Sequence, residues 1–277
     1  QGYVPPRRSQ RPRTPCNRIM GRQYHAAHMT ASFLILETGR PIASMRRHGG
    51  FDHWIRVAAG LRAGAVDTVD AQSGAALPNP ADRIGVIVTG SGAMVSDREP
   101  WSERAAQWLK DAVTSGVPVF GICYGHQLLA HALGGEVTDN PAGRGMGTVQ
   151  VKTTGGAATD PLFAGLPSPF AAQATHLQSV RRLPEGAQCL ATAAHDPNYA
   201  FRFGDQAWGV QFHPEFSAMH MRGYIRARAD ALRAEGRDPV ALAQAVSAAP
   251  HARDVLRRFV RHAYTVRGRA GTVPGGR

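Results

Sequence analysis

The sequence predicts an α/β protein built on a doubly wound, mostly parallel β-sheet. Compact apolar runs at residues 32–37, 84–89 and 117–122 fit strands that are buried on both faces. Apolar residues at helical spacing follow at 100–115 and 125–133. Because strand and helix alternate, we expect parallel strands joined by crossover helices. With 277 residues, 43% of them hydrophobic, the chain can bury the core of one large domain.

The elements around these runs extend the same flavodoxin-like pattern. Residues 40–58 mix apolar and basic side chains and predict a helix that is broken or preceded by Gly49 and Gly50. Residues 65–71 alternate apolar and polar side chains, as a strand nearer the sheet edge should. Residues 73–82 are rich in Gly, Pro and Asn and predict a loop.

From residue 136 to 207 the pattern changes to short strands between glycine loops, which predicts a small antiparallel extension. These strands are expected at 147–152, 170–176, 188–192 and 200–203. A buried strand at 208–213 is stopped by Pro214. The chain beyond residue 217 predicts C-terminal helices, which are expected at 219–235, 239–247 and 251–264.

The net charge of +12 is concentrated outside the predicted fold. Residues 1–28 contain six arginines and no acid, and the last ten residues add Arg269 and Arg277. Without those eight charges the rest of the chain carries only +4, so we expect no role in nucleic-acid binding. Met29 precedes the first strand pattern and is the expected natural start of the protein.

The cysteine content and the lack of long apolar runs predict a cytoplasmic protein. Cys16, Cys123 and Cys189 are too few for a disulfide framework, which indicates a reducing compartment. No apolar run approaches the roughly 18 residues that cross a bilayer. His126 and His131 are five residues apart, which does not suit a metal pair, and no phosphate or dinucleotide loop is present. We therefore expect no metal and no cofactor.

The most informative stretch is a strand that turns sharply into a helix at Cys123. Gly121 and Gly125 flank this cysteine and leave room for a tight backbone crossing that exposes the sulfur above the sheet edge. The first N–H groups of the helix would favour a thiolate there. The alternative is a buried cysteine in a packed turn, since free cysteine is often buried. The flanking glycines favour a nucleophile.

A cysteine nucleophile needs a base and a group that orients the base. His213 ends the last predicted strand, and Glu215 follows two residues later. Positions i and i+2 of an extended chain project to the same side, so the carboxylate can accept from the far imidazole nitrogen. Cys123, His213 and Glu215 therefore form a candidate catalytic triad. The alternative for His213 is a core histidine beside a helix-capping acid.

Acyl transfer also needs N–H donors for the oxyanion. The residue after the nucleophile, Tyr124, supplies one backbone N–H. The loop at residues 89–93 follows a neighbouring strand, and its Ser91 amide is the candidate for the second donor, with Gly90 and Gly92 allowing unusual backbone angles. Gly90 is also expected to lie beside the substrate. The alternative is a glycine-rich turn that only leads to the next helix.

These motifs together resemble class I glutamine amidotransferases, in particular the stand-alone members similar to the glutaminase domain of GMP synthase. The resemblance rests on Gly-Ile-Cys-Tyr-Gly-His-Gln at 121–127, His-Pro-Glu at 213–215 and the upstream glycine loop, and it covers most of residues 32–216. It implies a Cys-His-Glu amidohydrolase that forms a γ-glutamyl thioester and releases ammonia. The implied organisation is a disordered extension (1–28), the amidotransferase domain (29–216), its helical extension (217–266) and a disordered tail (267–277).

The resemblance also implies which residues bind the substrate. Gln127 would bind the amino-acid end of glutamine. His176, Leu177 and Gln178 correspond to a pocket loop in which relatives often carry Ser-His-Gly-Asp, so Leu177 and Gln178 depart from the pattern. Gly145 is a second departure, because relatives often place an acidic residue there. The preference between glutamine and another γ-glutamyl amide therefore stays open.

Several functions fit these residues. The first is a glutaminase that passes ammonia to an unidentified acceptor in a separate synthetase subunit, since residues 217–266 are too few for an ATP-binding domain. The second is a γ-glutamyl peptidase or hydrolase with no acceptor. A redox or chaperone-like protein with a related cysteine elbow fits less well, because Tyr124 stands where such proteins tend to have histidine. The last alternative is a catalytically inactive regulatory or binding protein on the same fold.

Overall fold

The computed structural model describes residues 1–2, 31–194 and 196–270. Contacts divide the chain into Gln1–Thr30 and Ala31–Arg277, and all the helices and strands given below belong to the second unit. The expected disordered extension lies outside the described residues apart from its first two, and so does Met29. Most of the expected C-terminal tail, residues 271–277, lies outside them as well.

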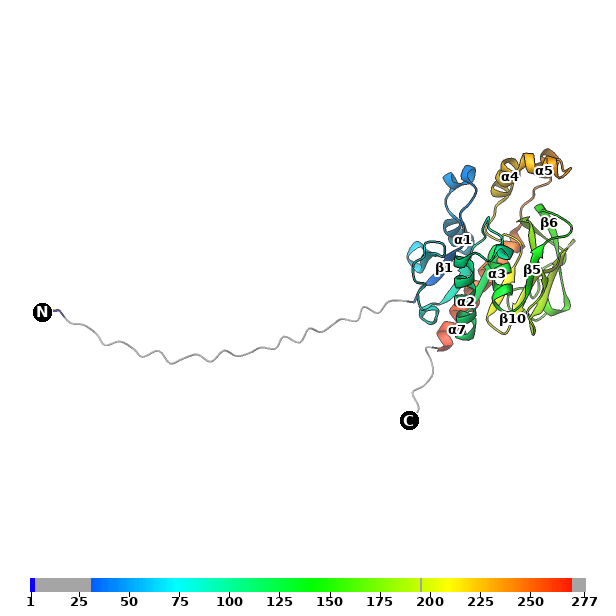
Figure 1. The fold of residues 1–277 in the computed structure, drawn as a ribbon. Coiled ribbons are helices and arrows are strands. Elements are labelled where there is room, and N and C mark those ends of the chain that lie inside the picture. Colours follow the sequence, from blue (N-terminus) through cyan, green and yellow to red (C-terminus); the bar gives the residue numbers. More distant parts are fainter. Residues whose placement is uncertain (3–30, 195, 271–277) are drawn as a thin grey trace. The chain divides into compact units, whose positions relative to one another are not determined.

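The described elements alternate in the predicted way and then become antiparallel and helical (Figure 1). The strands are β1 (Phe33–Glu37), β2 (Val66–Asp70), β3 (Gly85–Val88), β4 (Val119–Ile122), β5 (Glu136–Asp139), β6 (Gly145–Thr153), β7 (Phe170–His176), β8 (Gln178–Arg182), β9 (Gln188–Ala193), β10 (Asp196–Phe203) and β11 (Ala207–Val210). The α-helices are α1 (Phe51–Ala59), α2 (Pro100–Thr114), α3 (Tyr124–Ala132), α4 (Ala218–Ala227), α5 (Ala229–Ala234), α6 (Pro239–Gln244) and α7 (Pro250–Ala270). Short 3₁₀ turns lie at Ala43–His48, Ala63–Ala65, Pro80–Asp82, Val95–Asp97 and Gly155–Ala157.

In the described part of the chain, nine strands form one mixed sheet in the order β2-β1-β3-β4-β11-β10-β9-β6-β7. The pairs from β2 to β11 are parallel, and those from β11 to β7 are antiparallel. Strands β5 and β8 form a separate antiparallel pair.

The predicted α/β fold is confirmed, and the antiparallel extension continues the main sheet. Because β4 and β11 are neighbours, their carboxyl ends lie side by side at one sheet edge, which brings residues 123 and 213 near each other.

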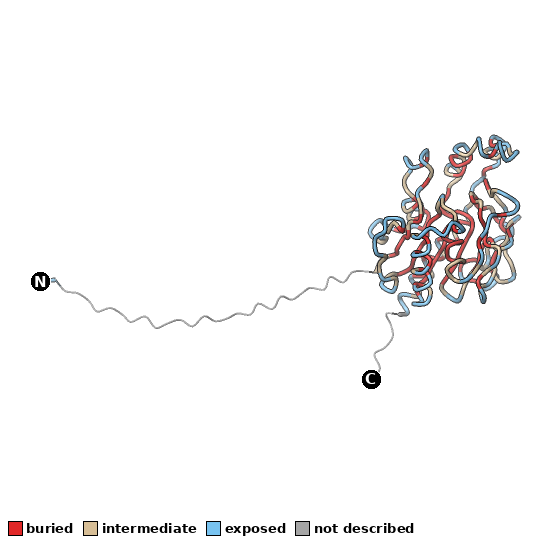
Figure 2. Tube along the Cα trace, viewed as in Figure 1, coloured by how far each residue is buried: buried red, intermediate tan, exposed pale blue. Residues whose placement is uncertain are grey.

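The sheet separates two apolar cores, and β1 contributes alternate side chains to each. Phe33 and Ile35 pack in the core that contains α1 and α7, whereas Leu34 and Leu36 pack with α2 and α3. Figure 2 shows that buried residues follow the central strands while the outer helices and loops are exposed. The near-continuous apolar runs of the sequence thus arise from strands covered on both faces.

Several predicted boundaries are corrected by the structure. Strand β11 ends at Val210, so residues 211–213 leave the sheet before the predicted end at His213. The predicted helix over 219–235 is divided at Arg228 into α4 and α5. Helix α7 continues to Ala270, so the first part of the expected tail is helical. Strands β5 and β8 are short and carry many polar residues, and the sequence pattern did not reveal them.

Two features are missing from the described part of the chain: a membrane-spanning helix and a metal-binding cluster. Among the described residues, no helix combines the length and the apolar character that a bilayer crossing requires. The same residues contain no group of three His, Cys, Asp or Glu side chains that could hold a metal ion.

Candidate active site

Cys123 occupies the bend between β4 and α3 with φ +53° and ψ −101°. This left-handed φ is uncommon for a residue with a Cβ and marks local backbone strain, which is typical of a nucleophile held on a tight turn. The bend is fixed by two hydrogen bonds, from Cys123 N to Val210 O (2.9 Å) and from Gly125 N to Thr89 O (3.1 Å). The residue itself is buried, with 5% of its surface exposed.

The two glycines are required by this crossing. A Cβ at Gly125 would lie 2.6 Å from Val88 O, and a Cβ at Gly121 would overlap the carbonyl of Gly125. Backbone atoms cannot move away as a flexible side chain could. Strand β4 and helix α3 therefore approach each other only because these positions lack side chains.

His213 and Glu215 form a buried pair at the neighbouring strand end. His213 Nδ1 lies 2.7 Å from Glu215 Oε1, and both residues are 2% exposed. The sequence predicts that an extended backbone aligns His213 with Glu215, but both residues lie in the turn after β11. His213 N donates to Gln173 O at 2.9 Å and anchors this turn. His213 Nε2 is buried and has no hydrogen-bond partner among the described residues.

Cys123 and His213 meet beside Gly90. A Cβ at Gly90 would lie 3.0 Å from His213 Cε1 and 3.8 Å from Cys123 Cβ, so both side chains flank this glycine. Burial alone would lower the pKa of His213, but the charges of Glu215 and then of Cys123 outweigh it and raise the pKa to about 10. At neutral pH the imidazole therefore carries a proton on each nitrogen.

Phe216 covers the histidine. Its ring stacks on His213 with 4.2 Å between ring centroids and contacts Trp54 and Tyr224 on its other sides. This aromatic cover shields the His213–Glu215 pair from water, which strengthens their interaction. No role was expected of Phe216 from the sequence, because no motif marks it.

The candidate oxyanion donors Tyr124 and Ser91 lie beside Cys123 in the lining of one cavity. Tyr124 is the first residue of α3, so its N–H has no acceptor within the helix. Ser91 follows the β3 loop, which Thr38 fixes by donating from N to Thr89 Oγ1 and from Oγ1 to Thr89 O, both at 2.9 Å. The absence of a side chain at Gly39 lets Ser91 pack closely there. Ser91 and Tyr124 both line the cavity above Cys123.

The cavity beside Cys123 has a volume of about 60 Å³. Its lining includes most of the predicted site residues and several others: Ser91, Gly92, Ala93, Met94, Cys123, Tyr124, Gln127, Arg144, Thr175, His176, Leu177, Gln178 and Arg228. The lining does not include His213, Glu215 or Gly90. A larger hollow of about 620 Å³ lies elsewhere, beside the ends of α2 and α3, and contains no candidate triad residue.

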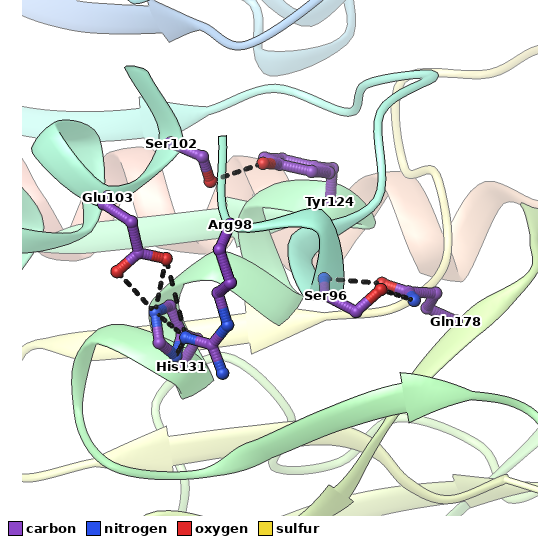
Figure 3. Close-up of polar contacts among 7 residues, drawn as sticks. All are labelled: Ser96, Arg98, Ser102, Glu103, Tyr124, His131 and Gln178. Atoms are coloured by element: carbon purple, nitrogen blue, oxygen red, sulfur yellow. Dashed lines mark hydrogen bonds and ion pairs between the residues drawn. The ribbon is translucent and has the colours of Figure 1, made fainter. Parts of the chain in front are cut away.

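The predicted substrate-binding side chains are tied to their neighbours. Gln127 Nε2 donates to Gln178 O (2.7 Å) and to Gln211 Oε1 (3.0 Å). The Gln178 amide faces Ser96, accepting from its N–H at 3.3 Å and donating to its Oγ at 2.6 Å (Figure 3), and it also donates to Asp139. Gln127 and Gln178 thus hold the cavity wall together.

His176 fills the space opened by Gly145. A Cβ at Gly145 would overlap the His176 ring, so the ring occupies the position of the missing side chain. His176 Nδ1 donates to Gln178 O at 3.0 Å, and burial lowers the pKa of His176 to about 4. The ring is therefore neutral and gives this wall of the cavity no charge.

Sequence reasoning missed two cationic residues in the lining, Arg144 and Arg228. Arg144 precedes β6, and Arg228 joins α4 to α5. A chain with 32 basic residues gives no local signal that these two share a cavity. Only the tertiary fold brings them together.

A cysteine at a strand-to-helix bend, beside a buried histidine–carboxylate pair on an α/β sheet, fits the class of cysteine-nucleophile acyl-transfer enzymes. Residues 65–228 match the family described as glutamine amidotransferase class-I, and the chain belongs to this family. Its domain is related to the glutaminase domain of GMP synthase.

Curated relatives include the glutamine-hydrolysing GMP synthase of Thermomicrobium roseum, 42% identical over 132 residues, which are 47% of this chain and 23% of the relative. A γ-glutamyl-L-1-hydroxyisopropylamide hydrolase from a Pseudomonas species is 31% identical over 166 residues, 55% of this chain and 54% of the relative. The matched segment thus spans about a quarter of that GMP synthase and about half of the hydrolase.

Solved structures show the same fold. A glutamine amidotransferase from Thermotoga maritima superposes with a TM-score of 0.63 at 22% identity, covering 84% of this chain and 97% of that one. A glutamine amidotransferase from Methylobacillus flagellatus gives a TM-score of 0.63 at 24% identity, covering 89% and 97% of the two chains.

Proposed function

We propose that the chain hydrolyses the side-chain amide of glutamine, or of another γ-glutamyl amide, through a thioester on Cys123, and releases ammonia or an amine. The observation that carries this proposal is the 2.7 Å contact between His213 and Glu215, buried beside the strained cysteine. A nucleophile, a proton carrier and an orienting carboxylate are thereby within one small region, as acyl transfer requires.

In the first proposed step, Cys123 attacks as a thiolate, its proton already being held by His213; Sγ forms a bond to the amide carbon, and the N–H groups of Ser91 and Tyr124 donate to the oxyanion. The C–N bond then breaks, and His213 Nε2 gives its proton to the leaving nitrogen. The raised pKa of His213 suits this donation, because the proton is already present at neutral pH. The products are ammonia or an amine and a γ-glutamyl thioester.

In the second step a water molecule attacks the thioester carbon and loses a proton to His213. The C–S bond breaks, glutamate leaves, and Cys123 is regenerated beside a protonated His213. Glu215 orients the imidazole and balances its positive charge in both steps. No oxidant, metal or cofactor is needed to balance this sequence.

The fate of the ammonia separates two candidate functions. Similarity to GMP synthases favours transfer of the ammonia to an unidentified acceptor. Similarity to the Pseudomonas hydrolase, which the chain covers over a larger share of its length, favours hydrolysis of a γ-glutamyl amide with no acceptor. We place the glutaminase first because several GMP synthases match at higher identity.

The experiment measures ammonia release from glutamine and amine release from γ-glutamyl dipeptides by purified protein. We expect turnover of glutamine by the wild type and by Cys189→Ala, and none by Cys123→Ala. Cleavage of dipeptides with refusal of glutamine would replace the glutaminase by the hydrolase. Turnover of neither, with a fully folded protein, would leave the catalytically inactive regulator.

A further inference from the structure

Helices α4 and α5 follow the candidate triad in the sequence, and the residue between them lines the cavity beside Cys123. Ser217 caps α4 by accepting from His220 N at 3.2 Å, so this helix begins directly after the His-Pro-Glu motif. It ends at Arg228, where φ −109° and ψ +16° separate it from α5. Figure 1 shows α4 and α5 at the same end of the fold as β6. Arg228 lies at the break between the two helices and contributes to the lining of the cavity beside Cys123.

The start of β6 is tied to this helical segment. Arg144 Nε donates to both carboxylate oxygens of Glu235, at 2.9 and 3.2 Å, and the Arg144 side chain is 11% exposed. Arg237 donates to the carbonyls of Arg144 (2.6 Å) and Met146 (3.1 Å). The two cavity walls that carry Arg144 and Arg228 are therefore held against each other.

The two guanidinium groups differ in how their charges are compensated. Glu235 neutralises Arg144, whereas the side chain of Arg228 makes no hydrogen bond or ion pair with any described residue. Its Nε is buried without a partner. Burial and then the charge of Arg144 lower the pKa of Arg228, and the weaker opposing influence of Tyr224, Cys123 and Glu235 does not offset them. An unpaired buried donor is costly unless a ligand satisfies it.

The cavity lining contains no carboxylate that could compete for this cation. Neither Asp nor Glu is among its described residues, and Gly145, beside Arg144, gives no side chain. The nearby Asp139 accepts from Gln178 Nε2 at 3.1 Å and is not in the lining. An anionic group of the substrate is therefore the partner that the cavity lacks.

We propose that Arg228 is a substrate-specificity residue that binds the α-carboxylate of the γ-glutamyl substrate, beside the Arg144–Glu235 pair. This inference rests on the proposed function and assigns one end of its substrate. A carboxylate is planar and accepts two hydrogen bonds from a guanidinium, so binding would satisfy the unpaired Nε–H and compensate the charge. The other end of the substrate then lies at Cys123.

The test compares γ-glutamyl p-nitroanilide with the same compound carrying a carboxamide in place of its α-carboxylate. Both report cleavage by absorbance and differ only in the group that Arg228 would contact. We expect the wild type to favour the carboxylate in kcat/KM by about 10- to 100-fold, the usual range for a hydrogen-bonded charge. In Arg228→Gln the preference should fall to near unity, mainly through a higher KM.

Two further variants separate specificity from folding. Arg228→Lys keeps the charge and should retain part of the preference, and Arg226→Gln, which changes an exposed arginine near the end of α4, should retain all of it. An unchanged preference in Arg228→Gln, or equal cleavage of both compounds by the wild type, would overturn the inference while leaving the proposed function intact. If the wild type cleaves neither anilide but hydrolyses glutamine, ammonia release from glutamine and from glutamine α-amide gives the same comparison. Ammonia release from neither of these would overturn both proposals.

Discussion

The imidazole Nδ1 of His213 donates to Glu215 Oε1 over 2.7 Å, and both residues are only 2% exposed. This contact keeps the histidine protonated at neutral pH, because the buried carboxylate favours the imidazolium more than burial opposes it. In the proposed reaction this pair holds the proton that the leaving nitrogen receives, and the pH dependence of that proton can be measured.

Activity should fall as the pH rises through about 10, because His213 then loses the proton that the leaving nitrogen needs. The folded-state pKa is raised above the ordinary 6.5, so the active form predominates below it. Glu215→Gln removes the stabilising charge, so the alkaline limb of kcat/KM should move to lower pH. We expect activity at pH 7 to drop by about 10²- to 10⁴-fold. An alkaline limb at the same pH in both proteins would contradict this role of Glu215.

Cys123→Ala should abolish hydrolysis and leave the fold intact. The sulfur donates one weak hydrogen bond, to Thr175 O at 3.7 Å, and also interacts with His213, so its removal should cost about 1 kcal/mol of unfolding free energy. Denaturant unfolding and ammonia release measure the two effects separately. Substantial residual turnover in Cys123→Ala would assign the nucleophile elsewhere.

Gly125→Ala should destabilise the fold strongly. The new methyl group would stand 2.6 Å from the carbonyl of Val88, and the strand and helix would have to separate. We expect a loss of about 1–3 kcal/mol or more in unfolding free energy, by analogy with overpacked cores. Gly64→Ala is the matched control, since its Cβ would meet no atom within 4 Å. Equal stability of the two variants would show that the crossing tolerates a side chain.

The phenol of Tyr124 and the hydroxyl of Ser102 share a buried hydrogen bond of 2.6 Å (Figure 3). Ser102→Ala leaves the phenol without a partner and should cost about 1–3 kcal/mol. Adding Tyr124→Phe should recover part of that loss, because the unsatisfied group is removed. Strictly additive losses in this double-mutant cycle would show that the contact contributes nothing.

The sequence predicts the strand-to-helix bend at Cys123 well, because the residues that determine the bend are close together in the chain. Gly121, Cys123 and Gly125 lie within five residues of each other, and the strand-to-helix change is visible in the apolar pattern. The pairing of His213 with Glu215 is expected for the wrong geometric reason, since the strand ends at Val210 and a turn aligns the side chains. The two residues are only two positions apart in the sequence, so their side chains can meet from an extended strand or from a turn.

The rest of the cavity beside Cys123 was less predictable, because its lining depends on contacts between segments that are distant in the sequence. No Gly or Pro marks the break at Arg228, and nothing local places that residue near Arg144, 84 positions earlier in the chain. The strands β5 and β8 each present polar residues, so their pairing gave no apolar signal. Charge and burial at these positions follow from the packing of segments distant in the sequence.

The most direct test of the central claim is covalent labelling of the folded protein by a diazo-ketone analogue of glutamine, followed by mass analysis of the peptides. The account predicts a single adduct on Cys123, none on Cys16 or Cys189, and much slower labelling in His213→Ala. An active protein that is labelled at another residue, or that turns over glutamine without any adduct at Cys123, would contradict it.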